Sequence, residues 1–160
     1  TIDNFQNIYE EKWANMMRDK LGLFGDNKDD KKLINDLLNW MEKNKADYTN
    51  TFCYLMNIKI GNNDLYNDKD FINWSNDWQK RIFLNNNSKA KSLELMKNSN
   101  PIIIPRNHKV EEALIAANED NLEVMNRLLT ILNKPYDEQN DIESYQYPLN
   151  DKNYKTFCGT

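Results

Sequence analysis

The stretch "NPIIIPRNHKVEEALIAANEDN", residues 100–121, places three isoleucines between two prolines and follows them with the only histidine of the chain. Proline disfavours helical backbone in the residue that precedes it, so Asn100 and Ile104 are expected to be extended. Residues 101–105 should therefore form a short extended strap. Because three exposed isoleucines would be costly, we expect the strap to pack onto helices.

A helical pattern begins directly after the strap. Its apolar side chains recur at offsets of three, four and seven, as on one face of a helix: Val110, Ala113, Leu114 and Ala117. Asp120 and Glu123 then have the spacing of a capping box at the start of another helix, which ends near Pro135. The sequence thus predicts a helical hairpin from about residue 106 to 132.

The same periodicity predicts five further helices upstream of the strap. The first covers about residues 3–21, and the others are marked by candidate caps or by an aromatic repeat: Asp29 or Asp30, Asp47, the repeat Phe71, Trp74, Trp78 and Ile82, and Ser88. The aromatic repeat is more typical of a buried core stripe than of a platform for stacking nucleotides. Since no run of alternating residues indicates a strand, the expected fold class is all-α, an irregular domain of six or seven helices.

The last part of the chain has no periodicity. Residues 135–160 mix acids with tyrosines, which indicates an irregular, extended tail running over the surface. The final residues, "TFCGT" (156–160), are small and apolar, so docking of this end is expected. We therefore divide the chain into a helical part, 1–134, and a tail, 135–160.

Composition excludes several classes of protein. The chain has 160 residues, 39% of them apolar, which is enough for the core of one domain. A formal net charge of −4 argues against a nucleic-acid binder, which needs a clustered basic face. With no membrane-length apolar run and no signal peptide, we expect no membrane partner and a cytoplasmic location.

Few residues are candidates for chemistry. His108 is the only imidazole, and at a helix start a polar capping role is more typical than catalysis. Two distant cysteines do not make a zinc site, and four glycines do not make a phosphate-binding loop. Acidic pairs such as Asp29-Asp30 are usually solvated, although such pairs can hold Mg²⁺ or act as an acid and a base. The sequence assigns no catalytic, cofactor-binding or metal-binding residue to this chain.

Several segments resemble, in order, the C-terminal third of the selenoprotein O family, protein adenylyltransferases with a protein-kinase-like fold. They are "KLGL" (20–23), "DYTNTF" (47–52), "WSNDWQKR" (74–81), "NPIIIPRNHKVEEAL" (100–114), "PYDE" (135–138) and "TFCGT" (156–160). The resemblance spans nearly the whole chain. The most specific parts are the strap leading into Arg106, Asn107 and His108, and the cysteine near the C-terminus.

This resemblance implies a full-length enzyme that binds ATP with Mg²⁺ and transfers AMP to Ser, Thr or Tyr hydroxyls of proteins. The family's nucleotide-binding and metal-binding residues lie upstream, so none is carried onto a position here. The chain, which starts at Thr1 without a methionine, is expected to be a piece of a longer protein. It would be a helical extension that packs on the upstream kinase-like core. Arg106, Asn107 and His108 would either shape the hairpin or contact that core.

The two cysteines have different expected roles. Cys53, next to Phe52 and Tyr54, is expected to be a buried, unreactive thiol, and it stands where the resemblance would place a basic residue. The resemblance implies that Cys158 is a redox latch, paired reversibly with a cysteine of the core. The alternative from another class is a self-contained helical module that binds a partner protein.

Overall fold

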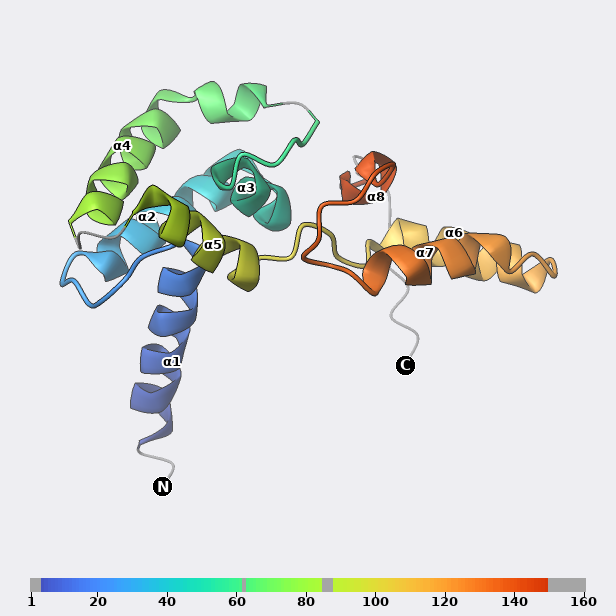
Figure 1. Ribbon diagram of the computed structural model, residues 1–160, viewed down its shortest axis with the longest axis horizontal. Coiled ribbons are helices and arrows are strands. Elements are labelled where there is room, and N and C mark those ends of the chain that lie inside the picture. Colours follow the sequence, from blue (N-terminus) through green and yellow to red (C-terminus); the bar gives the residue numbers. More distant parts are fainter. Residues whose placement is uncertain (1–3, 62, 85–87, 150–160) are drawn as a thin grey trace. The chain divides into compact units, whose positions relative to one another are not determined.

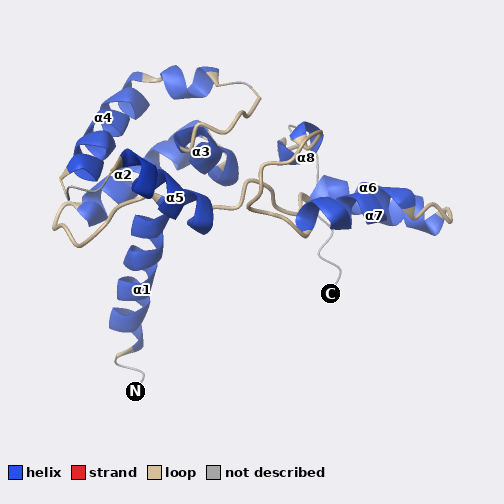
Figure 2. Cartoon of the chain, in the orientation of Figure 1, coloured by secondary structure: helices blue, strands red, loops and turns tan. Residues whose placement is uncertain are grey.

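The computed structural model describes residues 4–61, 63–84 and 88–149. These residues form α-helices, one 3₁₀ helix and no strand (Figure 2). The helices are α1 (Phe5–Lys20), α2 (Asp30–Asn44), α3 (Tyr48–Leu55), η1 (Asp64–Asn67), α4 (Lys69–Phe83), α5 (Lys89–Ser99), α6 (Asn107–Asn118), α7 (Glu123–Leu132) and α8 (Glu143–Gln146). The predicted all-α class is confirmed. Two helices were not predicted: the 3₁₀ helix η1, and α8, a single turn in the stretch expected to be irregular.

The helices belong to two compact units, which Figure 1 colours from blue to green and from yellow to red. Unit 1 is Thr1–Asn100 and holds α1 to α5, and unit 2 is Pro101–Thr160 and holds α6 to α8. The boundary lies at the start of the strap. The separate tail from residue 135, which the sequence suggested, stays a prediction.

The core of unit 1 is built on the aromatic repeat of α4. Phe71, Trp74, Trp78 and Ile82 are all buried, so the prediction of a core stripe is confirmed. The indole nitrogens are also satisfied: Trp74 Nε1 donates to the Leu33 carbonyl of α2 at 2.8 Å, and Trp78 Nε1 donates to the Leu21 carbonyl at 2.9 Å. Burial of each large side chain contributes about 1.5–3 kcal/mol, and the two indole bonds fix α4 against α2 and the end of α1.

Side chains cap three helices of unit 1. Asp47 Oδ1 accepts from Asn50 N at 2.8 Å, and Ser88 Oγ accepts from Lys91 N at 3.2 Å, so both predicted caps are confirmed. Asp68 caps α4 in the same way. The prediction that Asp29 or Asp30 caps α2 is wrong, because neither side chain accepts a capping bond there.

Unit 2 contains the predicted hairpin, with α6 and α7 side by side (Figure 1). Its buried side chains are Ala113, Leu128 and Ile131. The predicted capping box is wrong. Asp120 has a left-handed φ of 61° and turns the chain, while the Asn121 Oδ1 accepts from Glu123 N at 3.0 Å. The side chain of Asn121 therefore accepts from the N–H group that the spacing assigned to Asp120, while Leu122 is the N-cap residue of α7.

The strap was predicted to be buried, and the structure confirms this for two of its three isoleucines. Ile102 and Ile103 are buried and Ile104 is partly exposed. The backbone N–H groups of Ile102 and Ile103 both donate to the Pro135 carbonyl, at 2.8 and 3.3 Å. Since an extended segment lacks internal hydrogen bonds, this distant carbonyl satisfies donors that would otherwise be buried without an acceptor.

Candidate functional site

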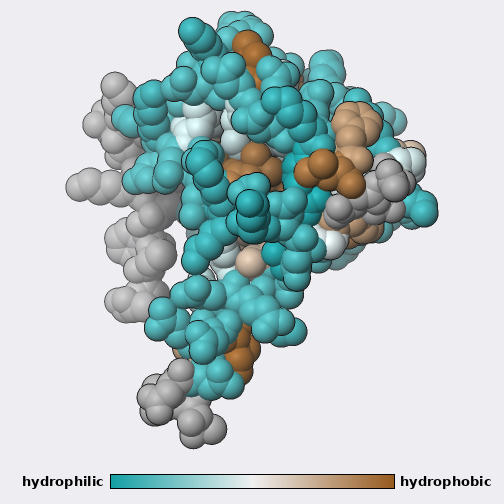
Figure 3. Space-filling view, turned by 90° about the vertical axis from the view of Figure 1, so that its left-hand side faces the viewer, coloured by the Kyte–Doolittle hydropathy of each residue, from teal (hydrophilic) through white to brown (hydrophobic). Residues whose placement is uncertain are grey.

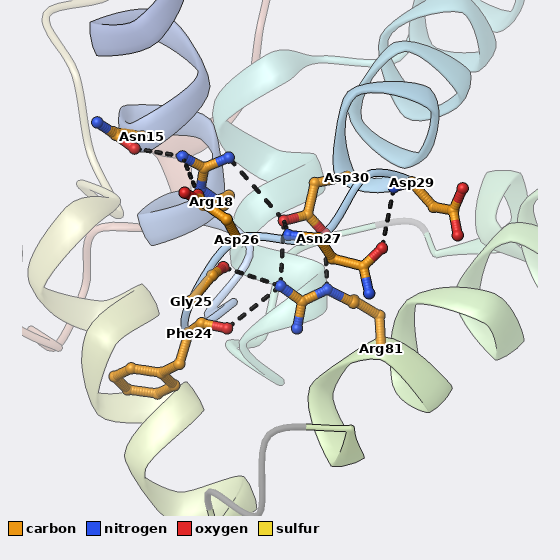
Figure 4. Close-up of polar contacts among 9 residues, drawn as sticks. All are labelled: Asn15, Arg18, Phe24, Gly25, Asp26, Asn27, Asp29, Asp30 and Arg81. Atoms are coloured by element: carbon orange, nitrogen blue, oxygen red, sulfur yellow. Dashed lines mark hydrogen bonds and ion pairs between the residues drawn. The ribbon is translucent and has the colours of Figure 1, made fainter.

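A buried ion pair joins α2, α4 and the loop between α1 and α2. The guanidinium of Arg81, 5% exposed, faces the carboxylate of Asp30, 2% exposed, with Nε–Oδ1 at 2.6 Å and Nη2–Oδ2 at 3.0 Å. Arg81 Nη2 also donates to the carbonyls of Phe24 and Gly25, at 3.2 and 3.0 Å (Figure 4). One arginine thus holds the start of α2 and the preceding loop to α4.

Further polar groups surround the same carboxylate. Asn27 N donates to Asp30 Oδ2 at 3.1 Å, and Arg18 Nη1 lies 4.0 Å from that oxygen. Arg18 also pairs with Asp26, Nη2–Oδ1 at 2.7 Å, and with Asn15 (Figure 4). Because both Asp30 oxygens accept bonds from these donors, the carboxylate is unsuited to act as a base or as a metal ligand.

The pair corrects one expectation from the sequence. The acidic pair Asp29-Asp30 was expected to be solvated, but Asp30 is buried and neutralised by Arg81. A signal was present in the sequence: Arg81 follows Trp78 by three positions and so falls on the buried face of α4. A charged residue on such a face requires a buried partner of opposite charge.

A pocket of about 260 Å³ opens beside the ion pair. Two exposed ion pairs stand among its lining residues, Lys32 with Asp36 at 2.6 Å and Lys80 with Asp77 at 2.8 Å. The hydrogen bond to Asp36 raises the pKa of Lys32, and the hydrogen bond from Lys80 lowers the pKa of Asp77. Since these charges neutralise one another, the pocket offers no concentrated positive field for a phosphate group.

A second polar cluster ties the end of α1 to the end of α5. Lys20 Nζ donates to the Ser99 carbonyl at 3.2 Å and to Asn100 Oδ1 at 3.1 Å. Asn100 Nδ2 donates in return to the carbonyls of Lys20 and Met96, both at 2.9 Å. These reciprocal bonds form a clasp, Lys20 with Asn100, at the residue where the strap begins.

The ammonium of Lys20 also lies over two aromatic rings. Its Nζ is 5.5 Å from the ring centroid of Tyr48 and 5.1 Å from that of Phe52. Burial lowers the pKa of Lys20, the kind of shift that a catalytic lysine uses. Its hydrogen bonds go to backbone and amide oxygens, however, so the structure uses this ammonium to hold Asn100 in place.

Close packing at Gly22 supports the same junction. Gly22 has a φ of 67°, and a Cβ added there would lie 2.6 Å from the Ser92 carbonyl oxygen and 2.9 Å from Met96 Cγ. Only glycine adopts this backbone easily and leaves the space for α5. The end of α1 therefore meets α5 through both the clasp and this contact.

The three residues after the strap lie at the start of α6. Arg106 is the N-cap residue of α6, and its Nη2 donates to the Gln146 carbonyl at 2.8 Å. Asn107 is exposed, and His108 is partly buried. Gln146, which is buried, donates from Nε2 to the Ile102 carbonyl at 3.2 Å. Arg106 thus helps to join α8, the strap and the hairpin, all within unit 2.

No catalytic constellation assembles around these residues. Among residues 4–61, 63–84 and 88–149 there is no group of three or more His, Cys, Asp or Glu side chains placed to hold a metal ion. His108 is not brought to an acidic cluster of that kind. Of the three motif residues, Arg106 joins two elements of unit 2, whereas the roles of Asn107 and His108 stay predictions.

Comparison with known proteins places the chain in a family. The family model described as "Protein adenylyltransferase SelO" matches residues 1–133. The chain belongs to the SelO family. This confirms the resemblance that the motif segments indicated.

Curated relatives carry the name protein nucleotidyltransferase YdiU. The chain is 52% identical to the protein of Pelagibacter ubique, over 99% of this chain and 33% of the relative. It is 47% identical to that of Bacillus cereus, over 99% and 33%, and 43% identical to that of Alcanivorax borkumensis, over 100% and 34%. The chain therefore spans about a third of the length of the curated relatives it matches.

The segments that resemble the SelO family meet in pairs in the structure. "KLGL" contacts the first residue of the strap segment through Lys20 and Asn100, and "WSNDWQKR" contacts "KLGL" through the Trp78 indole. "PYDE" contacts the strap through the Pro135 carbonyl. Motif segments that lie far apart in the sequence are therefore in contact within each unit.

The structure describes only one of the two cysteines of this SelO chain. Cys53 is fully buried in α3, as predicted. Cys158 lies outside the described residues, so its redox role stays a prediction. In the described part of the chain, no helix combines the length and apolar character that crossing a bilayer requires.

Proposed function

We propose that this chain is the C-terminal helical part of a protein adenylyltransferase. The observation that carries the proposal is the SelO family match over residues 1–133 in a chain that spans a third of its relatives. The full-length enzyme would transfer AMP from ATP to Ser, Thr or Tyr hydroxyls of protein substrates. ATP and Mg²⁺ would be its cofactors, held by the upstream kinase-like core.

The role proposed for the chain itself is to support or regulate that core. Two features favour a supporting role over a catalytic one. The charged groups beside the pocket are neutralised in pairs, and the buried Asp30 carboxylate is saturated with donors. The polar residues of the resembling segments, Lys20, Asn100 and Arg106, bind backbone or amide oxygens, as expected for residues that fix a scaffold.

The test compares the chain with the full-length protein. Transfer of radiolabelled AMP from ATP to protein is measured with Mg²⁺ present, and ATP binding is measured by titration calorimetry. We expect transfer by the full-length protein and neither transfer nor micromolar ATP binding by the chain alone. Micromolar binding of ATP with Mg²⁺ by the chain alone would overturn the proposal, and an inactive full-length protein would favour a helical interaction module instead.

The role of Cys158 belongs to the same proposal. We infer from the resemblance that the thiol of Cys158 and a cysteine thiol of the upstream core form a disulfide that latches the end of the chain. The two electrons and two protons pass to the disulfide of an oxidised low-molecular-weight thiol, which is reduced to two thiols. Peptide mapping of the oxidised full-length protein without reductant tests this. A disulfide between Cys158 and an upstream cysteine is expected, whereas a free Cys158 or a bond to Cys53 would contradict the latch.

A further inference from the structure

Helix α1 consists of two unlike halves. Its C-terminal end is anchored in unit 1, where Met17 and the following Leu21 are buried. Its N-terminal half is not: every residue from 4 to 12 is exposed. In Figure 1 this half extends beyond the other helices of unit 1. Unit 1 therefore leaves the first two turns of the helix largely uncovered.

This exposed half carries a stripe of large apolar side chains. Phe5 is 67% exposed, Ile8 49%, Tyr9 58% and Met16 44%. Ile8 and Tyr9 follow Phe5 by three and four residues, and Met16 follows Tyr9 by seven. These offsets place the four side chains on one face of the helix, over a length of about 16 Å. The rings of Phe5 and Tyr9 stack on each other, with centroids 6.3 Å apart. Hydrophobic side chains are visible near the foot of Figure 3, where α1 lies, among mostly hydrophilic ones.

Such a stripe is not stable in water by itself. Helical segments of two or three turns are marginal without tertiary packing. One link between this half and the rest of unit 1 is the ion pair of Glu10 with Lys31 at 3.5 Å, which is exposed and contributes little. The N-terminal half of α1 therefore needs a surface packed on the stripe to remain helical in the full-length protein. Anchors at these offsets match an apolar groove that receives one helix face.

We propose that the α1 stripe, Phe5, Ile8, Tyr9 and Met16, docks into an apolar groove on the upstream part of the same SelO polypeptide. The inference rests on the proposed function. The groove is assigned to the upstream part for the following reason. The chain covers about a third of the length of its relatives, so about two thirds of their length lies outside it. The resemblance implies that the kinase-like core lies upstream, before α1. The stripe lies at the end of the chain that would join this upstream part.

The experiment compares two neighbouring substitutions in the full-length protein. Ile8→Glu places a charge in the stripe. Asn7→Glu places the same charge on the opposite face of the same exposed turn, so it serves as the matched control. Hydrogen exchange of the amides of residues 5–12 is measured by mass spectrometry. We expect protected amides in the unsubstituted protein, exchange at least about tenfold faster in Ile8→Glu, and no change in Asn7→Glu.

Two outcomes overturn the docking proposal directly: unprotected amides in the unsubstituted protein, or protection that survives Ile8→Glu. The occupant is tested separately. Lys31 is 71% exposed and pairs with Glu10, which lies outside the stripe, so a lysine cross-linker should join Lys31 to residues that precede Thr1. Cross-links only to unit 2 would show that unit 2 covers the stripe. Protection that disappears on dilution would show that a second copy of the protein covers it. Either result would contradict the proposal.

The same preparations separate this inference from the proposed function. If AMP transfer is absent while the exchange pattern is as expected, the proposed function is wrong and the docking stands. If transfer is present while the amides of residues 5–12 are unprotected, the function stands and the docking is wrong.

Discussion

The two units hold their elements in place by different means. In unit 1, side chains cap α3, α4 and α5, indoles bond to distant carbonyls, and a buried ion pair joins three segments. In unit 2 no N-cap side chain bonds to the starts of α6, α7 or α8. Among residues 101–149, the described part of unit 2, the buried apolar side chains are few: Ile102, Ile103, Ala113, Leu128, Ile131 and Ile142. Unit 2 therefore depends on the strap and on the carbonyls of Pro135 and Gln146.

The largest effect is expected from breaking the ion pair of unit 1. Asp30→Asn keeps the shape of the side chain but leaves the buried Arg81 charge unpaired. Loss of one partner of a buried pair costs about 3–5 kcal/mol, so the free energy of unfolding should fall by that amount. Denaturant unfolding followed by tryptophan fluorescence measures it. Asp77→Asn is the control, since its exposed pair with Lys80 should contribute too little to resolve.

An equal cost for these two substitutions would mean that the Asp30–Arg81 pair is not a main support of unit 1. The comparison between the units would then need another basis, such as the aromatic core of α4 alone.

The core of unit 2 is tested by shortening one isoleucine of the strap. Ile103→Ala removes a buried side chain and should cost about 2–5 kcal/mol. Because unit 2 has few other buried side chains, we expect amide exchange between residues 101 and 149 to accelerate. Ile104→Ala is the control, because Ile104 is partly exposed and should change exchange much less. Equal effects would mean that burial of the strap is not what stabilises unit 2.

A smaller effect is expected at the bond between α8 and the strap. Gln146→Ala removes the hydrogen bond from Gln146 Nε2 to the Ile102 carbonyl, and the loss of such a bond costs about 0.5–1.5 kcal/mol. Exchange of the Ile102 and Ile103 amides should therefore accelerate. Ser144→Ala, an exposed position of the same helix, should leave these amides unchanged. If Gln146→Ala also leaves them unchanged, the bond from Gln146 is not what holds the strap.

Sequence reasoning succeeded where one segment determines its own structure. The aromatic repeat identified the core face of α4, and Asp47 and Ser88 identified two helix starts, because periodicity and capping are local properties. Proline geometry likewise located the strap. The all-α class followed from these local patterns.

It failed where a polar residue chooses among distant partners. Asp30 was expected to cap α2 or to be solvated, but Arg81, 51 positions away, takes its carboxylate. Asp120 was expected to begin a capping box, but Asn121 takes the N–H of Glu123. The bond from Ile102 to the Pro135 carbonyl and the Lys20–Asn100 clasp also depend on tertiary approach. No spacing in the sequence specifies such pairs, although a charge on an apolar helix face indicates that one exists.

The smallest effect concerns the cap of α4, a device that unit 2 lacks. Asp68 Oδ2 accepts from the Trp40 indole at 2.8 Å, and from the backbone N–H groups of Asp70 and Phe71. The indole bond is the main reason that the pKa of Asp68 lies below its ordinary value, followed by the bond from Phe71 N. Between the lowered pKa and the ordinary pKa, the folded state then binds fewer protons than the unfolded state. The cap therefore stabilises unit 1 above the ordinary carboxyl pKa, and this contribution is lost as the pH falls through the lowered pKa.

Carbon NMR of the carboxyl groups measures this shift, and salt identifies its cause. High salt screens the exposed pair of Asp77 with Lys80, so the lowered pKa of Asp77 should return toward its ordinary value. The main bond to Asp68 comes from an uncharged indole, so the pKa of Asp68 should stay low in the same salt. Trp40→Phe should raise it without salt. If salt instead restores both carboxyls alike, charge rather than the indole bond sets the Asp68 pKa, and the capping contrast between the units would rest on electrostatics.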